Sequence, residues 1–222
     1  MSFTGTDTDD SLTKSIRESY DELANEYALR IYDELQQKPF DRELLDRYAS
    51  IVKGRGEVCD MGCGPGHVTR YLREGGIDAF GLDLSPRMLE QARRLNPDIK
   101  FLEGNMLSLS FSEKSVAGIV AFYSICNLPE DSLSRVFSEM QQVLKPGGLI
   151  LLAFHIGNEI IHRDEMWGRK VSIDFFLFQT STIQSLLKNA GFSIIESFER
   201  EPYGPEIEYQ SRRAYIFAQK SE

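Results

Sequence analysis

The sequence contains little of what disulfide scaffolds and zinc sites require. Its three cysteines are Cys59, Cys63 and Cys126. The number is odd, and the first two flank a glycine turn without a second pair that could complete a zinc site. We therefore expect buried, reduced thiols, as in a cytoplasmic protein, with a redox or metal role as the alternative. No acidic cluster suggests a metal-assisted site, so we expect no bound metal.

Long apolar runs and basic clusters are also missing. The longest apolar runs, such as residues 149–154, are far too short to span a bilayer. The N-terminus has neither a basic start nor an apolar stretch, so we expect no signal peptide. The formal net charge is −9, and pairs such as Arg212-Arg213 are interpreted as solvated faces. A nucleic-acid ligand would need a larger basic face, so we expect neither nucleic acid nor membrane as a partner.

What remains is an ordinary globular composition, with 41% hydrophobic and 27% charged residues. The 222 residues are enough for one domain with an elaborated cap. We expect a disordered tail over residues 1–15 and an N-terminal helical cap over 16–51, followed by the main domain over 52–220. In the cap, apolar residues from Tyr20 to Tyr27 recur at helical spacing, and Pro39 marks a break between two helices.

Strands and helices alternate through the main domain, which predicts a doubly wound α/β fold with a mostly parallel sheet. A β-rich insertion over residues 156–179 interrupts this alternation after the fifth strand. The pattern predicts strands at residues 57–61, 77–82, 99–102, 116–121, 149–154, 192–198 and 213–218. It predicts helices at residues 68–74, from 85 onward, at 131–144 and from 181 to 191.

Two of these helices carry recognisable end signals. Ser85 followed by Pro86 is typical of an N-cap with a first-turn proline. Ser181 and Gln184 have the spacing of a capping box, and Gly191 supplies a C-terminal stop.

A glycine turn follows the first strand. Gly62, Gly64 and Gly66 lie between this strand and a helix, where the backbone must turn tightly and approach a ligand without a Cβ in the way. Asp60, at the end of the strand, would repel a pyrophosphate. It would instead orient a cationic amino group, directly or through a water molecule.

Polar side chains also follow the next two strands. Asp83 comes roughly 20 residues after Gly64, the spacing at which a carboxylate holds ribose hydroxyls. Asn105 and the large apolar Met106 follow the third strand, where the pair can hydrogen-bond an adenine edge and cover its face. Open α/β sheets bind their ligands at these carboxyl ends of strands.

These residues resemble the first motif of class I S-adenosylmethionine-dependent methyltransferases, an acidic residue followed by Gly-x-Gly-x-Gly. Three other segments are similar to the same family: Lys-Pro-Gly-Gly at residues 145–148, Gly-Phe at 191–192, and the run over 20–27. The last is found in small-molecule members such as the quinone-biosynthesis type. The resemblance covers about residues 20–219. Each motif alone is moderately specific, and their order makes the resemblance strong.

The resemblance implies a seven-stranded, Rossmann-like methyltransferase sheet with a reversed final strand. It implies S-adenosylmethionine as cofactor, S-adenosylhomocysteine as product and a small-molecule methyl acceptor. Many members have Asp where this chain has Asn105, so an amide replaces a carboxylate contact to the adenine. The implied cofactor residues, from the methionine end to the adenine, are Tyr20, Tyr27, Asp60, Gly62, Gly64, Gly66, Asp83, Leu84, Met88, Asn105, Met106 and Phe122.

We place the acceptor between the N-terminal cap and the insertion, which acts as a substrate lid. His155 ends the fifth strand at the sheet edge that faces a substrate, so it is the candidate catalytic residue. His67, after the glycine turn, is interpreted as a surface or cap residue. The insertion contributes aromatic and other large apolar side chains, which form a lid or simple core: Met166, Trp167, Phe175, Phe176 and Phe178.

Two other functions compete with methyl transfer. An NAD-dependent oxidoreductase would place its third glycine where this chain has His67, and Asp60 does not suit a pyrophosphate. A catalytically silent S-adenosylmethionine-binding protein has the same motifs as an enzyme. Residues 127–129 do not match the tetrad of enzymes that methylate the amino groups of nucleic acid bases. The identity of the acceptor, the methylated atom and the oligomeric state stay open.

Overall fold

A seven-stranded sheet runs through the middle of the protein, in the order β3-β2-β1-β4-β5-β9-β8. The computed structural model describes residues 5–221. Strands β3 to β5 run parallel along this order, whereas β9 is antiparallel to both neighbours. The predicted doubly wound, mostly parallel sheet with a reversed final strand is confirmed. Its strands are β1 Val58–Met61, β2 Ala79–Asp83, β3 Phe101–Glu103, β4 Val116–Phe122, β5 Leu144–His155, β8 Phe192–Arg200 and β9 Arg213–Lys220.

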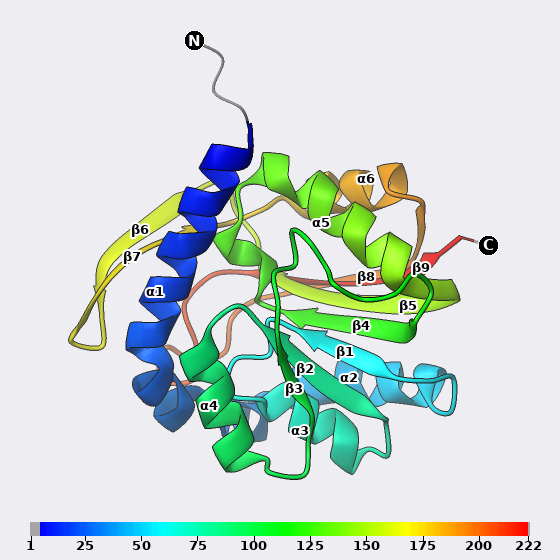
Figure 1. The fold of residues 1–222 in the computed structure, drawn as a ribbon, viewed down its shortest axis with the longest axis horizontal. Helices are drawn as coiled ribbons and strands as arrows, with labels where there is room; N and C mark the ends of the chain where they lie inside the picture. The colour runs from blue at the N-terminus through cyan, green and yellow to red at the C-terminus, as the bar shows by residue number, and fades with distance from the viewer. Residues whose placement is uncertain (1–4, 222) are drawn as a thin grey trace.

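Helices cover both faces of this sheet (Figure 1). Side chains of α2 and α3 pack on one face, and side chains of α5 and α6 pack on the other. The central strands are therefore buried on both sides, which explains their continuous apolar runs. The helices are α1 Gly5–Ile31, η1 Glu34–Gln37, α2 Pro39–Val52, α3 His67–Glu74, α4 Pro86–Leu95, η2 Ile125–Asn127, α5 Glu130–Val143 and α6 Thr180–Asn189.

The strand order reverses at β1 and β4. The chain first builds outward from β1 to β3 and then returns to place β4 on the other side of β1. Loops that leave β1 and β4 consequently diverge to opposite faces of the sheet. This divergence opens a crevice at the carboxyl ends of the strands, where such folds bind ligands.

One predicted helix cap is confirmed and one is wrong. The Ser85 Oγ accepts a hydrogen bond of 3.0 Å from the Met88 backbone N–H, which confirms the N-cap of α4. Helix α6 begins at Thr180, so Ser181 is not its cap. The Thr180 hydroxyl donates to Glu199 Oε1 on β8 instead, and this tertiary contact fixes the start of the helix. Gly191, with a φ of +87°, ends the helix as predicted.

The predicted tail over residues 1–15 is helical from Gly5 onward, and residues 1–4 lie outside the described residues. The Ser15 hydroxyl donates to the backbone oxygen of Ser172 on β7, at 2.9 Å. Ser19 also donates to this oxygen and accepts from the Ser172 N–H, both at 3.1 Å. These contacts supply a tertiary support for a polar segment whose sequence alone gives little reason to be ordered.

The predicted β-rich insertion is a two-stranded antiparallel hairpin, β6 Ile160–Met166 and β7 Arg169–Phe176. It forms its own small sheet and lies beside α1, away from the helices that cover the main sheet (Figure 1). The turn places Trp167 at a φ of +54°. The hairpin is therefore not part of the main sheet and lies beside the carboxyl ends of its strands.

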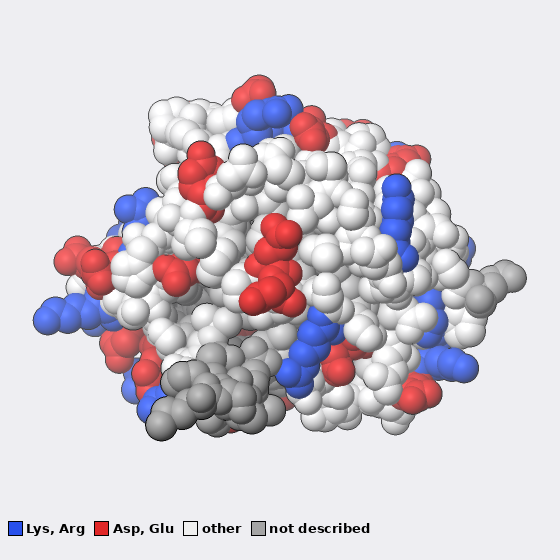
Figure 2. Space-filling model, turned by 90° about the horizontal axis from the view of Figure 1, so that it is seen from above, with Lys and Arg blue, Asp and Glu red and all other residues white. Residues whose placement is uncertain are grey.

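No helix within residues 5–221 is long and apolar enough to cross a membrane. Figure 2 shows one face of the molecule, on which Lys and Arg side chains are scattered singly among Asp and Glu. This face carries no continuous basic patch.

Candidate functional site

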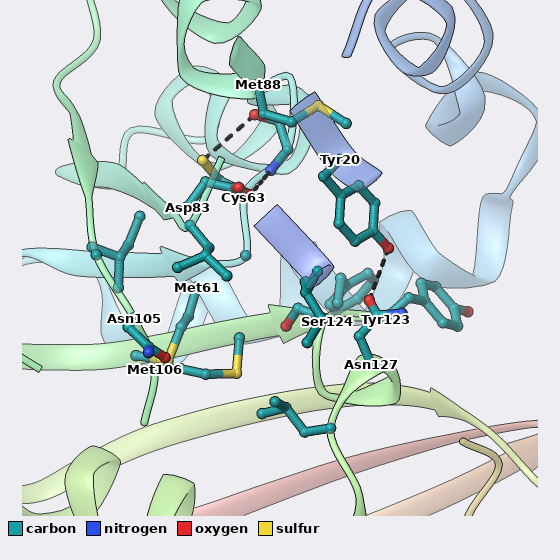
Figure 3. A pocket seen from close by; sticks show the side chains of 18 of the residues that line it. Tyr20, Met61, Cys63, Asp83, Met88, Asn105, Met106, Tyr123, Ser124 and Asn127 are labelled. Atoms are coloured by element: carbon teal, nitrogen blue, oxygen red, sulfur yellow. Dashed lines mark hydrogen bonds between the residues drawn. The ribbon is translucent and has the colours of Figure 1, made fainter. Parts of the chain in front are cut away.

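A cavity of about 950 Å³, including its open mouth, lies at the carboxyl ends of β1, β2 and β4 and is closed by α1. Figure 3 shows Asn105, Met106 and Met61 on one side of it, and Tyr20, Ser124 and Asn127 on the other. We call it the first cavity. Ten of the residues predicted to contact the cofactor line it: Tyr20, Tyr27, Gly62, Gly64, Asp83, Leu84, Met88, Asn105, Met106 and Phe122.

The glycine turn forms the floor of this cavity because its backbone is tied to β2. The N–H groups of Gly62 and Cys63 both donate to the backbone oxygen of Leu82, at 2.7 and 3.0 Å. Gly62 has a φ of +76°, and a Cβ there would lie 2.3 Å from the Cβ of Ser124. Only glycine satisfies both requirements.

Asp83 links the glycine turn to the start of α4. Its Oδ2 accepts from the Gly64 N–H at 2.8 Å, and its Oδ1 accepts from the Ser85 N–H at 2.9 Å. Burial raises the pKa of this carboxyl group, although the backbone donors oppose the shift. The predicted ribose ligand is thus also a structural clamp on the cavity floor.

Two predicted cofactor residues do not line the cavity. Asp60 is buried behind the turn, where its Oδ2 accepts from the Thr69 hydroxyl of α3 at 2.6 Å. Burial raises the pKa of Asp60 to about 6. Gly66 has a φ of +83°, and a Cβ there would lie 2.7 Å from the ring of Phe101. Both residues join the turn to α3 and β3, so the structure gives them packing roles.

Asn105 lies in the cavity wall with its amide held by local contacts. Its Oδ1 accepts from the Leu107 N–H at 2.9 Å, and its Nδ2 donates to the Thr13 hydroxyl at 3.3 Å. The neighbouring Met106 and, across the cavity, Met88 are apolar. A planar ring fits between such walls.

Aromatic rings lead from the first cavity to the hairpin. The ring centroids of Tyr20 and Tyr27 are 5.9 Å apart, and those of Tyr27 and Trp167 are 5.7 Å apart. The Tyr20 hydroxyl donates to Asn127 Oδ1 at 2.8 Å (Figure 3). Asn127 in turn donates to the backbone oxygen of Asp174 on β7 at 3.0 Å. The Tyr20 hydroxyl is therefore linked to the hairpin through Asn127.

A second cavity of about 1350 Å³, including its mouth, lies between η1, the end of β5, the hairpin and the loop before β9. Five of the predicted acceptor-site and lid residues line this second cavity: Tyr27, His155, Met166, Trp167 and Phe175. Phe178 does not, because it is buried against Phe154. Phe176 also packs on the main core and not into this space.

His155 lies in the wall of the second cavity. Its Nδ1 is 2.7 Å from the Ser211 hydroxyl, and its ring centroid is 5.1 Å from that of Tyr123. Burial, together with the positive charges of Arg213 and Lys38, lowers its pKa to about 3. The imidazole is therefore neutral at physiological pH.

Sequence reasoning found Asp83 but missed the other charged residues of the two cavities. Glu34 lines both of them, and its carboxylate contacts Lys38 Nζ at 2.7 Å and His67 Nε2 at 3.2 Å. Burial opposes its ionisation, but these two partners prevail and lower its pKa to about 2. His67 lines the first cavity and is not a surface residue. Arg213, 2% exposed, is not a solvated residue either.

No local sequence signal marks these residues. Lys38 precedes an ordinary helix-starting proline, and Glu208 and Arg213 follow a polar loop. Their significance depends on which distant elements pack around them.

Of the three cysteines, Cys63 lines the first cavity. All three are buried and free, as predicted, and burial raises the pKa of each thiol. Within residues 5–221, no three His, Cys, Asp or Glu side chains are grouped so that they could hold a metal ion.

Comparison with known proteins identifies the family to which this chain is similar. A family model described as a methyltransferase domain matches residues 58–148, which include the glycine turn and Asp83. An uncharacterised methyltransferase of Synechocystis is 30% identical over 149 residues, which cover 63% of this chain and 68% of that protein. A malonyl-[acyl-carrier protein] O-methyltransferase of Pectobacterium atrosepticum is 30% identical over 56% of this chain, which spans about half (53%) of that relative's length.

Solved structures agree on the fold. The DhpI-SAH complex matches 95% of this chain and 97% of its own, with a TM-score of 0.73 and 18% sequence identity. This match leaves only a twentieth of the chain uncovered.

Proposed function

Because the chain belongs to the S-adenosylmethionine-dependent methyltransferases, we propose that it transfers a methyl group from this cofactor to a small molecule. The cofactor occupies the first cavity and the acceptor the second. One observation carries this assignment: the two cavities share Tyr27, Glu34 and Tyr123 in their walls. A donor and an acceptor held on either side of these residues meet without leaving the protein, as methyl transfer requires.

The residues of the first cavity suit this cofactor. Two buried polar atoms of residues in its wall, Ser124 Oγ and His67 Nδ1, have no hydrogen-bond partner. Asp83 would hold the ribose, and the apolar side chains of Met88 and Met106 would enclose the adenine. The methionine part would lie over the glycine turn. When bound, the cofactor supplies a methyl group on a sulfonium, which is an electrophile.

The charges of the first cavity also suit a cationic ligand. Among the described residues, its lining includes the carboxylates of Glu34 and Asp83 but no Lys or Arg. Glu34 lies beside Tyr27 at the junction of the cavities, so its ionised carboxylate would face the positively charged end of the cofactor. Asp60, the acidic residue of the motif, would act through Thr69 and the position of α3.

The second cavity would align the acceptor and exclude water, and alignment alone is worth up to about 7–11 kcal/mol in such reactions. His155 would contact the acceptor, as a proton acceptor in one tautomer of its ring and as a hydrogen-bond donor in the other. The cap and the hairpin both line the second cavity, which supports a small molecule as partner and argues against nucleic acid. Three buried thiols are consistent with a cytoplasmic location.

Calorimetry on the purified protein tests the cofactor assignment. We expect binding of S-adenosylhomocysteine and none of NAD. The opposite result would refute the proposal. A screen of small-molecule acceptors, read out by S-adenosylhomocysteine formation, then separates an enzyme from a silent binding protein.

A further inference from the structure

The second cavity has a charged floor, which we define as Lys38, Glu208 and Arg213. All three side chains line the cavity and are nevertheless at most 8% exposed. Glu208 Oε2 lies 3.0 Å from Arg213 Nε and 3.8 Å from Lys38 Nζ. Such a group of buried charges is costly to maintain, so its arrangement at a cavity wall calls for a ligand of matching charge.

One carboxylate in this floor serves three cations. Behind the cavity, Arg200 donates to both oxygens of Glu208. These bonds occupy the acceptor sites that Lys38 and Arg213 would otherwise share. The second acid beside Arg200 is Asp41, whose pKa is raised by burial, although hydrogen bonds from Tyr215 and Arg200 oppose the shift. Lys38 has a second carboxylate partner in Glu34, at 2.7 Å, and Arg200 has one in Asp41, at 3.2 Å. Arg213 is therefore the cation of this group that, among the described residues, pairs with Glu208 alone.

The hydrogen bonds of Arg213 also leave its positive charge only partly compensated. Its terminal nitrogens donate to the backbone oxygens of Ser211 and Tyr209, which are uncharged. Its Nε is close to Glu208 but has no properly directed acceptor. A buried guanidinium with these partners retains much of its positive potential, because neutral acceptors compensate a charge only in part.

The opposite wall of the cavity is mostly apolar, although Arg163 and Glu165 of the hairpin also line it. It is formed by side chains of the hairpin and its exit, chiefly Met166, Trp167, Phe175 and Leu177. A ligand that satisfies both walls has an apolar body and one anionic end.

We propose that the methyl acceptor is a small amphipathic acid whose ionised oxygen, a carboxylate or phenolate, sits on the charged floor. This inference rests on the proposed function and names its substrate class. In the tautomer whose Nδ1 accepts from the Ser211 hydroxyl, Nε2 carries a hydrogen and can donate it to the oxyanion. Transfer forms an O–CH3 bond and breaks the S–CH3 bond, and the electron pair of that bond goes to sulfur. No proton is released, since the acceptor is already ionised.

The protein carries its own probe for this proposal. Trp167 is its one tryptophan and lines the second cavity, so intrinsic fluorescence reports ligands bound there. We would titrate matched acid and amide pairs (benzoate and benzamide, 2-naphthoate and 2-naphthamide, octanoate and octanamide) in the presence of S-adenosylhomocysteine. A charge-assisted contact predicts that at least one acid binds about ten- to a hundredfold more tightly than its amide. The same titration with 4-cyanophenol, below and above its own pKa, distinguishes a phenolate from a carboxylate site.

Two variants test whether the charged floor causes the preference for acids over amides. Lys38→Gln should reduce the preference for acids to about threefold or less, whereas Arg94→Gln, an exposed change on α4, should leave it unchanged. The comparison of acid with amide in the unaltered protein stands even if Lys38→Gln fails to fold. If no acid binds more tightly than its amide, the inference is wrong. Calorimetry with S-adenosylhomocysteine on the same samples distinguishes failure of this inference from failure of the proposed function. If S-adenosylhomocysteine does not bind, the proposed function itself is refuted.

Discussion

The two cavities differ in how they are built and in the charge that they present. The first is lined mainly by residues at the carboxyl ends of β1, β2, β3 and β4 and by α1, and its charged groups are the carboxylates of Glu34 and Asp83. The second draws its walls from η1, the hairpin and the loop before β9, and it adds Lys38, Arg163 and Arg213 to its acids.

The difference indicates that the proposed cofactor site and the proposed acceptor site are built by different parts of the fold. Strand ends and a glycine turn hold the first cavity in a geometry that backbone hydrogen bonds enforce. Side chains from distant segments define the second, so its chemistry can change without disturbing the sheet. Variants in the two cavities should therefore have separable effects.

The largest effect should follow from changing the backbone of the first cavity. Gly62→Ala places a Cβ 2.3 Å from Ser124 at a φ of +76°. The left-handed backbone costs about 1–2 kcal/mol and overpacking about 1–3 kcal/mol. We expect a loss of about 2–5 kcal/mol in the free energy of unfolding, measured by urea denaturation, and loss of S-adenosylhomocysteine binding.

Gly54→Ala is the matched control, because Gly54 has a φ of +78° but nothing within 4 Å of its would-be Cβ. It should show only the backbone cost, with cofactor affinity intact. Equal losses in the two variants would contradict the close approach as the cause.

Next in size is the loss of a carboxylate from the first cavity. Asp83→Ala removes the acceptor of two backbone N–H groups and of the proposed ribose contact. Such charge-assisted bonds are worth about 1.5–3 kcal/mol, so S-adenosylhomocysteine affinity should fall about ten- to a hundredfold in calorimetry. Glu165→Gln, on the hairpin side of the second cavity, should leave this affinity unchanged. A comparable loss in Glu165→Gln would erase the distinction between the cavities.

A smaller effect concerns His155 and acid. Its pKa, about 3 in the folded state, lies below the ordinary value of 6.5, so the unfolded chain binds more protons between these values. Stability supplied by the neutral imidazole is full above pH 6.5 and is lost as the pH falls, by about 1.4 kcal/mol per pH unit. His155→Gln should remove about 2 kcal/mol of the decline between pH 6.5 and 5. Denaturant titrations at both pH values measure this, and an unchanged slope would show that His155 is not desolvated.

The smallest effect on ligand binding is expected at Asp60. Its raised pKa of about 6 means that the folded state keeps its proton longer than the unfolded state. Protonation of Asp60 therefore adds to the free energy of unfolding at low pH. This contribution is lost as the pH rises from about 4 to 6, by on the order of 1 kcal/mol per pH unit. Asp60→Asn should flatten that decline and leave S-adenosylhomocysteine affinity within about threefold. A larger loss of affinity would mean that Asp60 contacts the cofactor after all.

Much of the first cavity was predictable from sequence for a physical reason. Residues that end neighbouring parallel strands must meet at one edge of the sheet, so Gly62, Asp83 and Asn105 converge whatever the details of packing. The spacing could not tell which way each side chain turns. Asp60 precedes the turn and points to Thr69, behind the cavity.

The sequence by itself determined the alternation of strands and helices, the glycine turn and the cap of α4. These are local properties, written in apolar periodicity and in the backbone angles that each residue permits. Only the tertiary structure decided that residues 5–15 are helical, that α6 begins at Thr180 and that Lys38 meets Glu208. Each of these depends on a partner far away in the chain, as Ser15 depends on Ser172. Contacts of this kind follow from how whole elements pack, and no short stretch of sequence contains that information.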